Sequence, residues 1–233
     1  MIRSGIAQVL LEIAMPTTIV DPEQDLSIAE LLRKLGGVPP ERVLLHPAPG
    51  TATEEDVLWY EARANKRLCE LIDGTLVEKA MSIRESMFAA WLASLLQDFV
   101  RPRNLGLIAT SDGMVRMVTG RIRLPDVAFF SWDRLPNRGW PTEPIASFAP
   151  NLAIEILSKS NTDEEMRLKR IDYFKSAVEL VWEVDPRTRI VRVYTDVNDI
   201  RELSGSDELD GGSVLPGFTL PLSELFGELD RHG

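Results

Sequence analysis

Apolar and polar residues alternate along several short stretches of this chain, most clearly in "NLAIEILSKSN" at residues 151–161. A period of two is the spacing of a β-strand, in which successive side chains point to opposite faces. The predicted strand has Leu152, Ile154 and Ile156 on one face and Ala153, Glu155 and Leu157 on the other. A carboxylate in such an apolar strand is costly unless it is paired or bound to a metal. Glu155 therefore requires a partner.

The rest of the pattern predicts one core domain over residues 51–228, preceded by an N-terminal extension at 1–50 and followed by a short tail at 229–233. The extension contains a short amphipathic helix that Gly36-Gly37 ends. The first half of the core is expected to contain a helix from Thr53 to about Asn65, a hairpin turning at Asp73-Gly74, a helix over about 83–100 and three short strands within 104–132. The second half is expected to contain the strand at 151–157, a helix capped by Asn161 or Thr162 and a strand pair joined at Asp185-Pro186. A short strand or loop and a terminal helix are expected within 213–226. This order predicts an α+β or mixed α/β fold, with helices packed on a mostly antiparallel or mixed sheet.

Composition narrows the functional classes. The net charge of −10 argues against generic nucleic-acid binding, although a local basic channel or a divalent-metal site is compatible with it. The single cysteine, Cys69, excludes an internal disulfide, and the two histidines, His46 and His232, have no Cys or His neighbour at zinc-ligand spacing. No apolar run approaches the roughly 20 residues that span a bilayer. The apolar "GIAQVLLEIAM" at 5–15 contains Glu12 and predicts a short helix or strand, so we expect a cytoplasmic protein.

A second acid has the same kind of surroundings as Glu155. Asp126, in "RLPDVAFF", alternates with apolar residues on a predicted strand. Two such strands can bring their carboxylates together, and hard oxygen ligands of this kind suit Mg²⁺, which can polarise a phosphodiester and activate water. Lys169 lies on the inward stripe of the following helix and could pair with these acids or steady a phosphate charge. Glu85, on the apolar face of the 83–100 helix, is a third candidate acid.

Each of these residues also has a purely structural interpretation. A single carboxylate in a strand is often an edge or solvent-facing residue. An inward lysine often extends its amine to solvent, and Glu85 in a first helical turn can simply complement the helix dipole. Spacing alone does not decide between these interpretations.

Several segments, taken together, resemble the Uma family of restriction-endonuclease-like proteins. These are "ELIDGTLVEK", "RLPDVAFFSWDRLP", "APNLAIEILSKSNTDEEMRLKRIDYFKSAVELVWEVDPRTRIVRVY" and "VLPGFTLPLSELF", which span roughly residues 53–226. The resemblance implies the PD-(D/E)xK nuclease fold, a mixed sheet flanked by helices. It also implies that Asp126 and Glu155 are the metal-binding acids and that the backbone carbonyl of Ile156 completes the metal shell.

The sequence departs from the superfamily signature at residue 157. The signature has a lysine two residues after the second acid, and this chain has Leu157 there. Lys169 is the natural substitute, and Lys159 is closer in sequence but falls toward the loop. Where many family members have a histidine at the start of the first core helix, this chain has Glu85, which matches an acid that some related nucleases use for metal.

Three functions remain open at this point. The first is a Mg²⁺-dependent (Mn²⁺ possible) endonuclease acting on DNA, with Asp126, Glu155 and Ile156 as metal ligands, Glu85 assisting and Lys169 positioning or activating water. The second is an inactive binding module of the same fold, which the net charge and Leu157 favour. The third is a metal-dependent hydrolase of a smaller phosphorylated substrate, which would need no basic DNA channel. The family analogy also suggests a homodimer.

Overall fold

The computed structural model describes residues 26–231 of the chain. Its helices are α1 (Ile28–Lys34), α2 (Glu54–Glu61), α3 (Ile83–Val100), α4 (Asp163–Lys175) and α5 (Leu222–Gly227), with single 3₁₀ turns at Pro40–Arg42, Pro136–Arg138 and Glu228–Asp230. Its strands are β1 (Cys69–Ile72), β2 (Thr75–Glu78), β3 (Gly106–Thr110), β4 (Met114–Arg116), β5 (Ile122–Arg123), β6 (Val127–Ser131), β7 (Ile145–Ala146), β8 (Leu152–Ile156), β9 (Leu180–Asp185), β10 (Ile190–Tyr194), β11 (Ile200–Ser204), β12 (Glu208–Gly211) and β13 (Leu215–Pro221). The apolar stretch at 5–15 and His232 lie outside the described residues.

The strands form a six-stranded, a five-stranded and a two-stranded sheet. The six-stranded sheet has the order β11-β10-β9-β8-β6-β3, and the five-stranded sheet has the order β2-β1-β5-β4-β7. Two pairs, β8 with β9 and β4 with β7, are parallel, and the other pairs are antiparallel. The mixed α+β fold predicted from the sequence is confirmed, although it divides its strands among several sheets rather than one.

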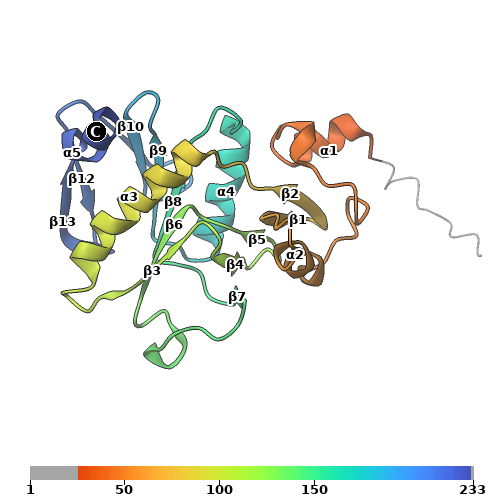
Figure 1. Ribbon diagram of the computed structural model, residues 1–233, viewed down its shortest axis with the longest axis horizontal. Coiled ribbons are helices and arrows are strands. Elements are labelled where there is room, and N and C mark those ends of the chain that lie inside the picture. The colour runs from red at the N-terminus through yellow and green to blue at the C-terminus, as the bar shows by residue number, and fades with distance from the viewer. Residues whose placement is uncertain (1–25, 232–233) are drawn as a thin grey trace, which may run out of the picture.

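Two apolar layers cover the six-stranded sheet. On one face α3 packs with α5 and the β12–β13 pair against Leu152, Ile154 and Ile156 of β8. On the other face Tyr173 of α4 packs against Ala153. The two faces of β8 are therefore those that the alternation predicts, and Glu155 lies on the α4 face. Figure 1 shows α1, α2 and the β1–β2 hairpin at one end of the molecule and β12, β13 and α5 at the other.

The local signals for most helices and turns hold. Thr53 precedes α2, and its N–H and hydroxyl donate to the Asp56 carboxylate. Thr162 caps α4 by accepting the N–H of Glu165 at 3.0 Å, and Asp73-Gly74 forms the β1–β2 turn with positive φ at both residues. Where three strands were expected within 104–132, there are four, because the chain leaves the β5 ladder at Leu124-Pro125 before β6 begins.

The part of the predicted N-terminal extension that the structure describes, residues 26–50, packs onto the core. Val43 bridges to Val77 of the hairpin. Arg42 forms a buried ion pair with Glu165 of α4 at 2.8 Å. Arg42, from the N-terminal part of the chain, therefore anchors the first turn of α4. Its partner Glu165 lies one helical turn before Lys169 on the same face of the helix.

Candidate active site

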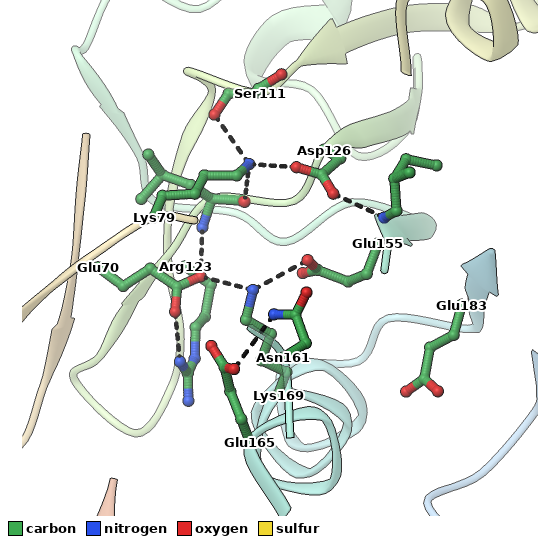
Figure 2. A network of polar contacts seen from close by, with 12 residues as sticks. Glu70, Lys79, Ser111, Arg123, Asp126, Glu155, Asn161, Glu165, Lys169 and Glu183 are labelled. Atoms are coloured by element: carbon green, nitrogen blue, oxygen red, sulfur yellow. Dashed lines mark hydrogen bonds and ion pairs between the residues drawn. The ribbon is translucent and has the colours of Figure 1, made fainter. Parts of the chain in front are cut away.

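Asp126 directly precedes β6, and Glu155 lies on β8, the strand that pairs with β6. The backbone N–H of Asp126 donates to the Ile154 carbonyl at 2.9 Å, which extends the β6–β8 pairing by one residue. The Oδ2 atom of Asp126 accepts the N–H of Ile156 at 2.7 Å. Because Ile156 directly follows Glu155, this bond ties the first acid to the strand that carries the second (Figure 2).

Glu155 is 3% exposed and both of its carboxylate oxygens have partners on α4. Its Oε2 lies 2.9 Å from Lys169 Nζ, and its Oε1 accepts the Tyr173 hydroxyl at 2.5 Å. Lys169 and Tyr173 are four residues apart on a helix and so share one face. The inward orientation of Lys169 that the helical pattern predicts is confirmed.

Lys169 also belongs to a buried network of alternating charges. Its Nζ lies 3.1 Å from Glu70 of β1, and Glu70 lies 2.7 Å from Arg123 of β5. Arg123 in turn pairs with Asp172 of α4 at 2.6 Å, and Asp172 pairs with Arg121 at 3.1 Å. Lys169 is thus shared between two glutamates, as Figure 2 shows, and the network fixes α4 against both sheets.

A second lysine, which follows β2, contacts the first acid. The amine of Lys79 lies 2.8 Å from Asp126 Oδ1 and donates to the carbonyls of Leu124 at 2.5 Å and Ser111 at 3.1 Å. The side chains of Lys79 and Asp126 are each 5% exposed. Each of the two acids therefore has its own lysine, Lys79 for Asp126 and Lys169 for Glu155.

The surroundings shift the pKa values of the two glutamates in opposite directions. Burial raises the pKa of Glu155 to about 7, and the negative charges of Asp126 and Glu70 add to this rise while Lys169 opposes it. Burial also acts on Glu70, but there Lys169 and Arg123 outweigh it and lower the pKa to about 2. Although burial disfavours its charge, Lys169 has a raised pKa because Glu155 and Glu70 flank it, so its amine stays protonated and acts as a fixed positive charge rather than as a base.

The raised pKa of Glu155 predicts a pH-dependent stability in metal-free buffer. The usual value is 4.5, so between about pH 4.5 and pH 7 the folded protein keeps a proton that the unfolded chain releases. The free energy of unfolding should therefore fall as the pH rises through this window, by on the order of 2 kcal/mol between pH 5 and pH 8. Urea unfolding in EDTA at several pH values measures this fall. Glu155→Gln should remove it, and the same slope in both proteins would contradict the prediction.

The other residues predicted for the site lie in different places. The Glu85 carboxylate accepts the Ser82 N–H at 3.2 Å and bonds its hydroxyl, and no described contact joins Glu85 to Asp126 or Glu155. This capping arrangement matches the structural interpretation of Glu85 as a first-turn acid. Lys159 is exposed in the loop after β8, and Leu157 is 8% exposed. Of the two lysines considered as substitutes at 157, Lys169 contacts Glu155, and no described contact joins either lysine to Asp126.

Ile156 keeps the orientation that a backbone metal ligand needs. In an extended strand the N–H and C=O of one residue point to the same side. Since the Ile156 N–H reaches Asp126, its carbonyl faces the Asp126 side as well, whereas the next N–H, of Leu157, donates to Val184 of β9 at 2.8 Å.

The donor set fits a divalent cation held by few protein ligands. Within residues 26–231, no group of three or more His, Cys, Asp or Glu side chains is arranged to hold a metal ion. Mg²⁺, however, is commonly held by one or two carboxylates with waters and substrate phosphate. Asp126 Oδ1 is buried and accepts no hydrogen bond from the described residues, its contact with Lys79 being an ion pair. Asp126, Glu155 and the Ile156 carbonyl are the residues that could hold a divalent cation in this way.

A polar cavity of about 440 Å³ opens at the carboxyl ends of β8 and β9, beginning at Leu157. Three arginines line it together with three acids, namely Arg170, Arg187, Arg192, Asp163, Glu183 and Asp185. Its charges are thus balanced rather than basic.

No helix among the described residues is long and apolar enough to cross a membrane.

Glu70, Lys79 and Tyr173 contact the charged groups of the site, and sequence reasoning did not identify them as site residues. Glu70 lies on β1, all four residues of which are buried. The signal for Glu70 was present in the sequence, because a glutamate between Cys69 and Leu71 repeats the isolated acid seen at Glu155. For Lys79, which directly follows Glu78, no local pattern distinguishes it from a surface lysine.

Comparison with known proteins identifies the family of this chain. No curated protein matches the chain. The crystal structure of a protein from Anabaena variabilis, described as a putative nuclease belonging to DUF820, superposes with a TM-score of 0.65 at 20% sequence identity and covers 73% of this chain and 96% of that one. The family model of Uma2, described as putative restriction endonuclease, matches residues 54–223 and so includes Asp126, Glu155, Lys169, Lys79 and Glu70. The match spans most of the chain, which therefore belongs to the Uma2 family of restriction-endonuclease-like proteins.

Proposed function

We propose that this protein is a Mg²⁺-dependent endonuclease that hydrolyses DNA phosphodiester bonds at the Asp126–Glu155 site. The observation that carries the proposal is the 2.7 Å bond from the Ile156 N–H to Asp126, because it ties Asp126 to the residue that directly follows Glu155 on β8. The membership of a family described as restriction endonucleases supports DNA as the substrate.

The chain's own residues have distinct tasks in this proposal. Asp126, Glu155 and the Ile156 carbonyl bind the cation, which when bound polarises the phosphodiester and lowers the pKa of water. Tyr173 and Lys169 hold the Glu155 carboxylate in one orientation through its two oxygens. The protonated amine of Lys169 also places a positive charge beside the position where the phosphate gains negative charge.

A supercoiled-plasmid assay tests the proposal. Purified protein should convert the plasmid to nicked and linear forms in Mg²⁺ or Mn²⁺, and EDTA should stop the conversion. A homodimer, which would let two sites cut both strands, stays a prediction, and the ratio of linear to nicked product together with the mass in solution examines it. Absence of nicking under all metal conditions would contradict the proposal.

One observation favours the second candidate, a non-enzymatic binding module. Each of the two acids forms an ion pair with a lysine, since Lys79 pairs with Asp126 and Lys169 pairs with Glu155. Isothermal titration separates the two functions. Heat of binding with micromolar to millimolar Mn²⁺ supports the nuclease, and no heat with the wild type supports the module.

A further inference from the structure

The amine of Lys79 occupies a small cage of oxygen atoms. Three oxygens lie within 3.1 Å of Nζ, from the Asp126 carboxylate and from the Leu124 and Ser111 carbonyls. An ammonium group has three N–H donors, and two of them donate to these carbonyls, while the positive charge forms an ion pair with Asp126 Oδ1. The main chain of Lys79 is fixed too, because its N–H donates to the Leu68 carbonyl at 2.8 Å. The lysine is thus placed like a bound cation.

The two oxygens of Asp126 have different partners. Oδ2 accepts the Ile156 N–H, and Oδ1 has the Lys79 amine as its contact among the described residues. A divalent cation bound by Asp126 would therefore compete for Oδ1 with the Lys79 charge. The superfamily lysine at residue 157 would follow Glu155 on its own strand, whereas Lys79 reaches the first acid from the hairpin, so it does not simply restore the missing residue.

We propose that Lys79 is a built-in counter-cation of Asp126, which competes with the divalent metal for Oδ1 and thereby sets the metal affinity of the site. This inference rests on the proposed function for the identity of the metal. Lys79 is a positioning residue in this role, because it acts through Asp126. In the metal-free protein it neutralises a buried carboxylate that would otherwise be unpaired, and it weakens the binding of any metal that must displace it.

Lys79→Met tests this inference because it removes the charge and keeps an unbranched apolar side chain. In EDTA the variant should unfold at a lower temperature than the wild type, since Asp126 loses its partner. Its Kd for Mn²⁺ in isothermal titration should be about tenfold lower than that of the wild type, and Mn²⁺ should raise its unfolding temperature by more than it raises that of the wild type. Lys79→Gln is the second variant if the methionine form does not fold, and the same tightening is expected.

Two further variants serve as controls. Lys79→Arg keeps the positive charge and should bind Mn²⁺ within about threefold of the wild type. Lys66→Met removes a lysine from a surface pair with Glu61, at 2.8 Å and 42% exposed, and should change neither Kd nor the effect of Mn²⁺ on unfolding. Weaker or unchanged Mn²⁺ binding by both neutral Lys79 variants would overturn the inference.

The outcome for Lys79 is separable from the outcome for the nuclease. If the wild type neither binds Mn²⁺ nor nicks DNA, but Lys79→Met binds Mn²⁺, the counter-cation role holds and the nuclease proposal fails. If the wild type nicks DNA and Lys79→Met binds Mn²⁺ no more tightly, the nuclease proposal holds and the role of Lys79 fails. No Mn²⁺ binding by any variant overturns the role of Lys79 as well.

Discussion

Asp126→Asn and Glu155→Gln are each expected to lower the rate of plasmid nicking by at least about a hundredfold. Both changes keep the size of the side chain but replace an anionic oxygen with an amide NH₂ group, which repels a cation. Metal catalysis of phosphodiester cleavage supplies several kcal/mol, and each 1.36 kcal/mol is a factor of ten in rate. The initial rate of conversion of supercoiled DNA, at saturating Mg²⁺ and equal protein concentration, measures the effect.

Glu183→Gln is the matched control for both variants. Glu183 is a buried glutamate on the neighbouring strand, in register with Glu155, but its carboxylate pairs with Arg170 and Tyr194. Figure 2 shows it apart from the lysines and the two acids. The control should keep nicking within a few-fold of the wild type. Equal residual nicking in the wild type and both site variants would mean that the activity belongs to a contaminant.

The same two variants divide the roles of the acids in metal binding. Asp126 offers one oxygen that is free of hydrogen bonds, whereas both oxygens of Glu155 are already in use by α4. Both variants should lose measurable Mn²⁺ binding, but Glu155→Gln should also lose the stability change between pH 5 and pH 8. Asp126→Asn should keep part of that change, because burial is the largest cause of the raised pKa of Glu155.

The sequence predicts those features of the site that depend on local periodicity. Alternation identifies β8 and the face of Glu155, and the helical stripe orients Lys169, because both depend on neighbours a few residues away. The same alternation suggests that Asp126 and Glu155 can approach each other, and the family resemblance implies that both bind metal. Glu85 shows where local pattern is not enough. Its position in the first turn of α3 suits a helix cap as well as a metal ligand, and in the structure its carboxylate accepts the N–H and hydroxyl of Ser82.

The buried charge network depends instead on contacts between residues far apart in the chain. Glu70, Lys79 and Arg123 meet the site because the β1–β2 hairpin and β5 form a second sheet beside the first, and no local pattern specifies where two sheets meet. A lysine after a strand or an arginine in a short strand is ordinary on a protein surface. Lys79 and Arg123 become identifiable only when the fold shows that they are buried and what they contact.

Arg123→Met is expected to lower the free energy of unfolding by about 3–5 kcal/mol. Arg123 is 1% exposed and joins Glu70 to Asp172, whose side chains are 1% and 0% exposed. Its removal leaves two buried carboxylates with one cation fewer, and the desolvation of those charges is no longer compensated. Urea unfolding at pH 7 measures the loss. Arg116→Met is the matched control, because its pair with Glu54 is more than a third exposed on both sides and should cost about 0–1 kcal/mol.

The loss of Arg123 should also reach the candidate site. Arg123 and Lys169 together keep Glu70 charged, so without Arg123 the Lys169 amine becomes the main counter-charge of Glu70 and pairs less strongly with Glu155. Arg123→Lys should recover part of the stability but not all of it. A guanidinium is planar and presents several N–H donors to Glu70 and Asp172 at once, whereas an ammonium group is a compact charge without that geometry. If Arg123→Met costs no more than Arg116→Met, the ion pairs that Arg123 makes with Glu70 and Asp172 contribute nothing measurable to stability.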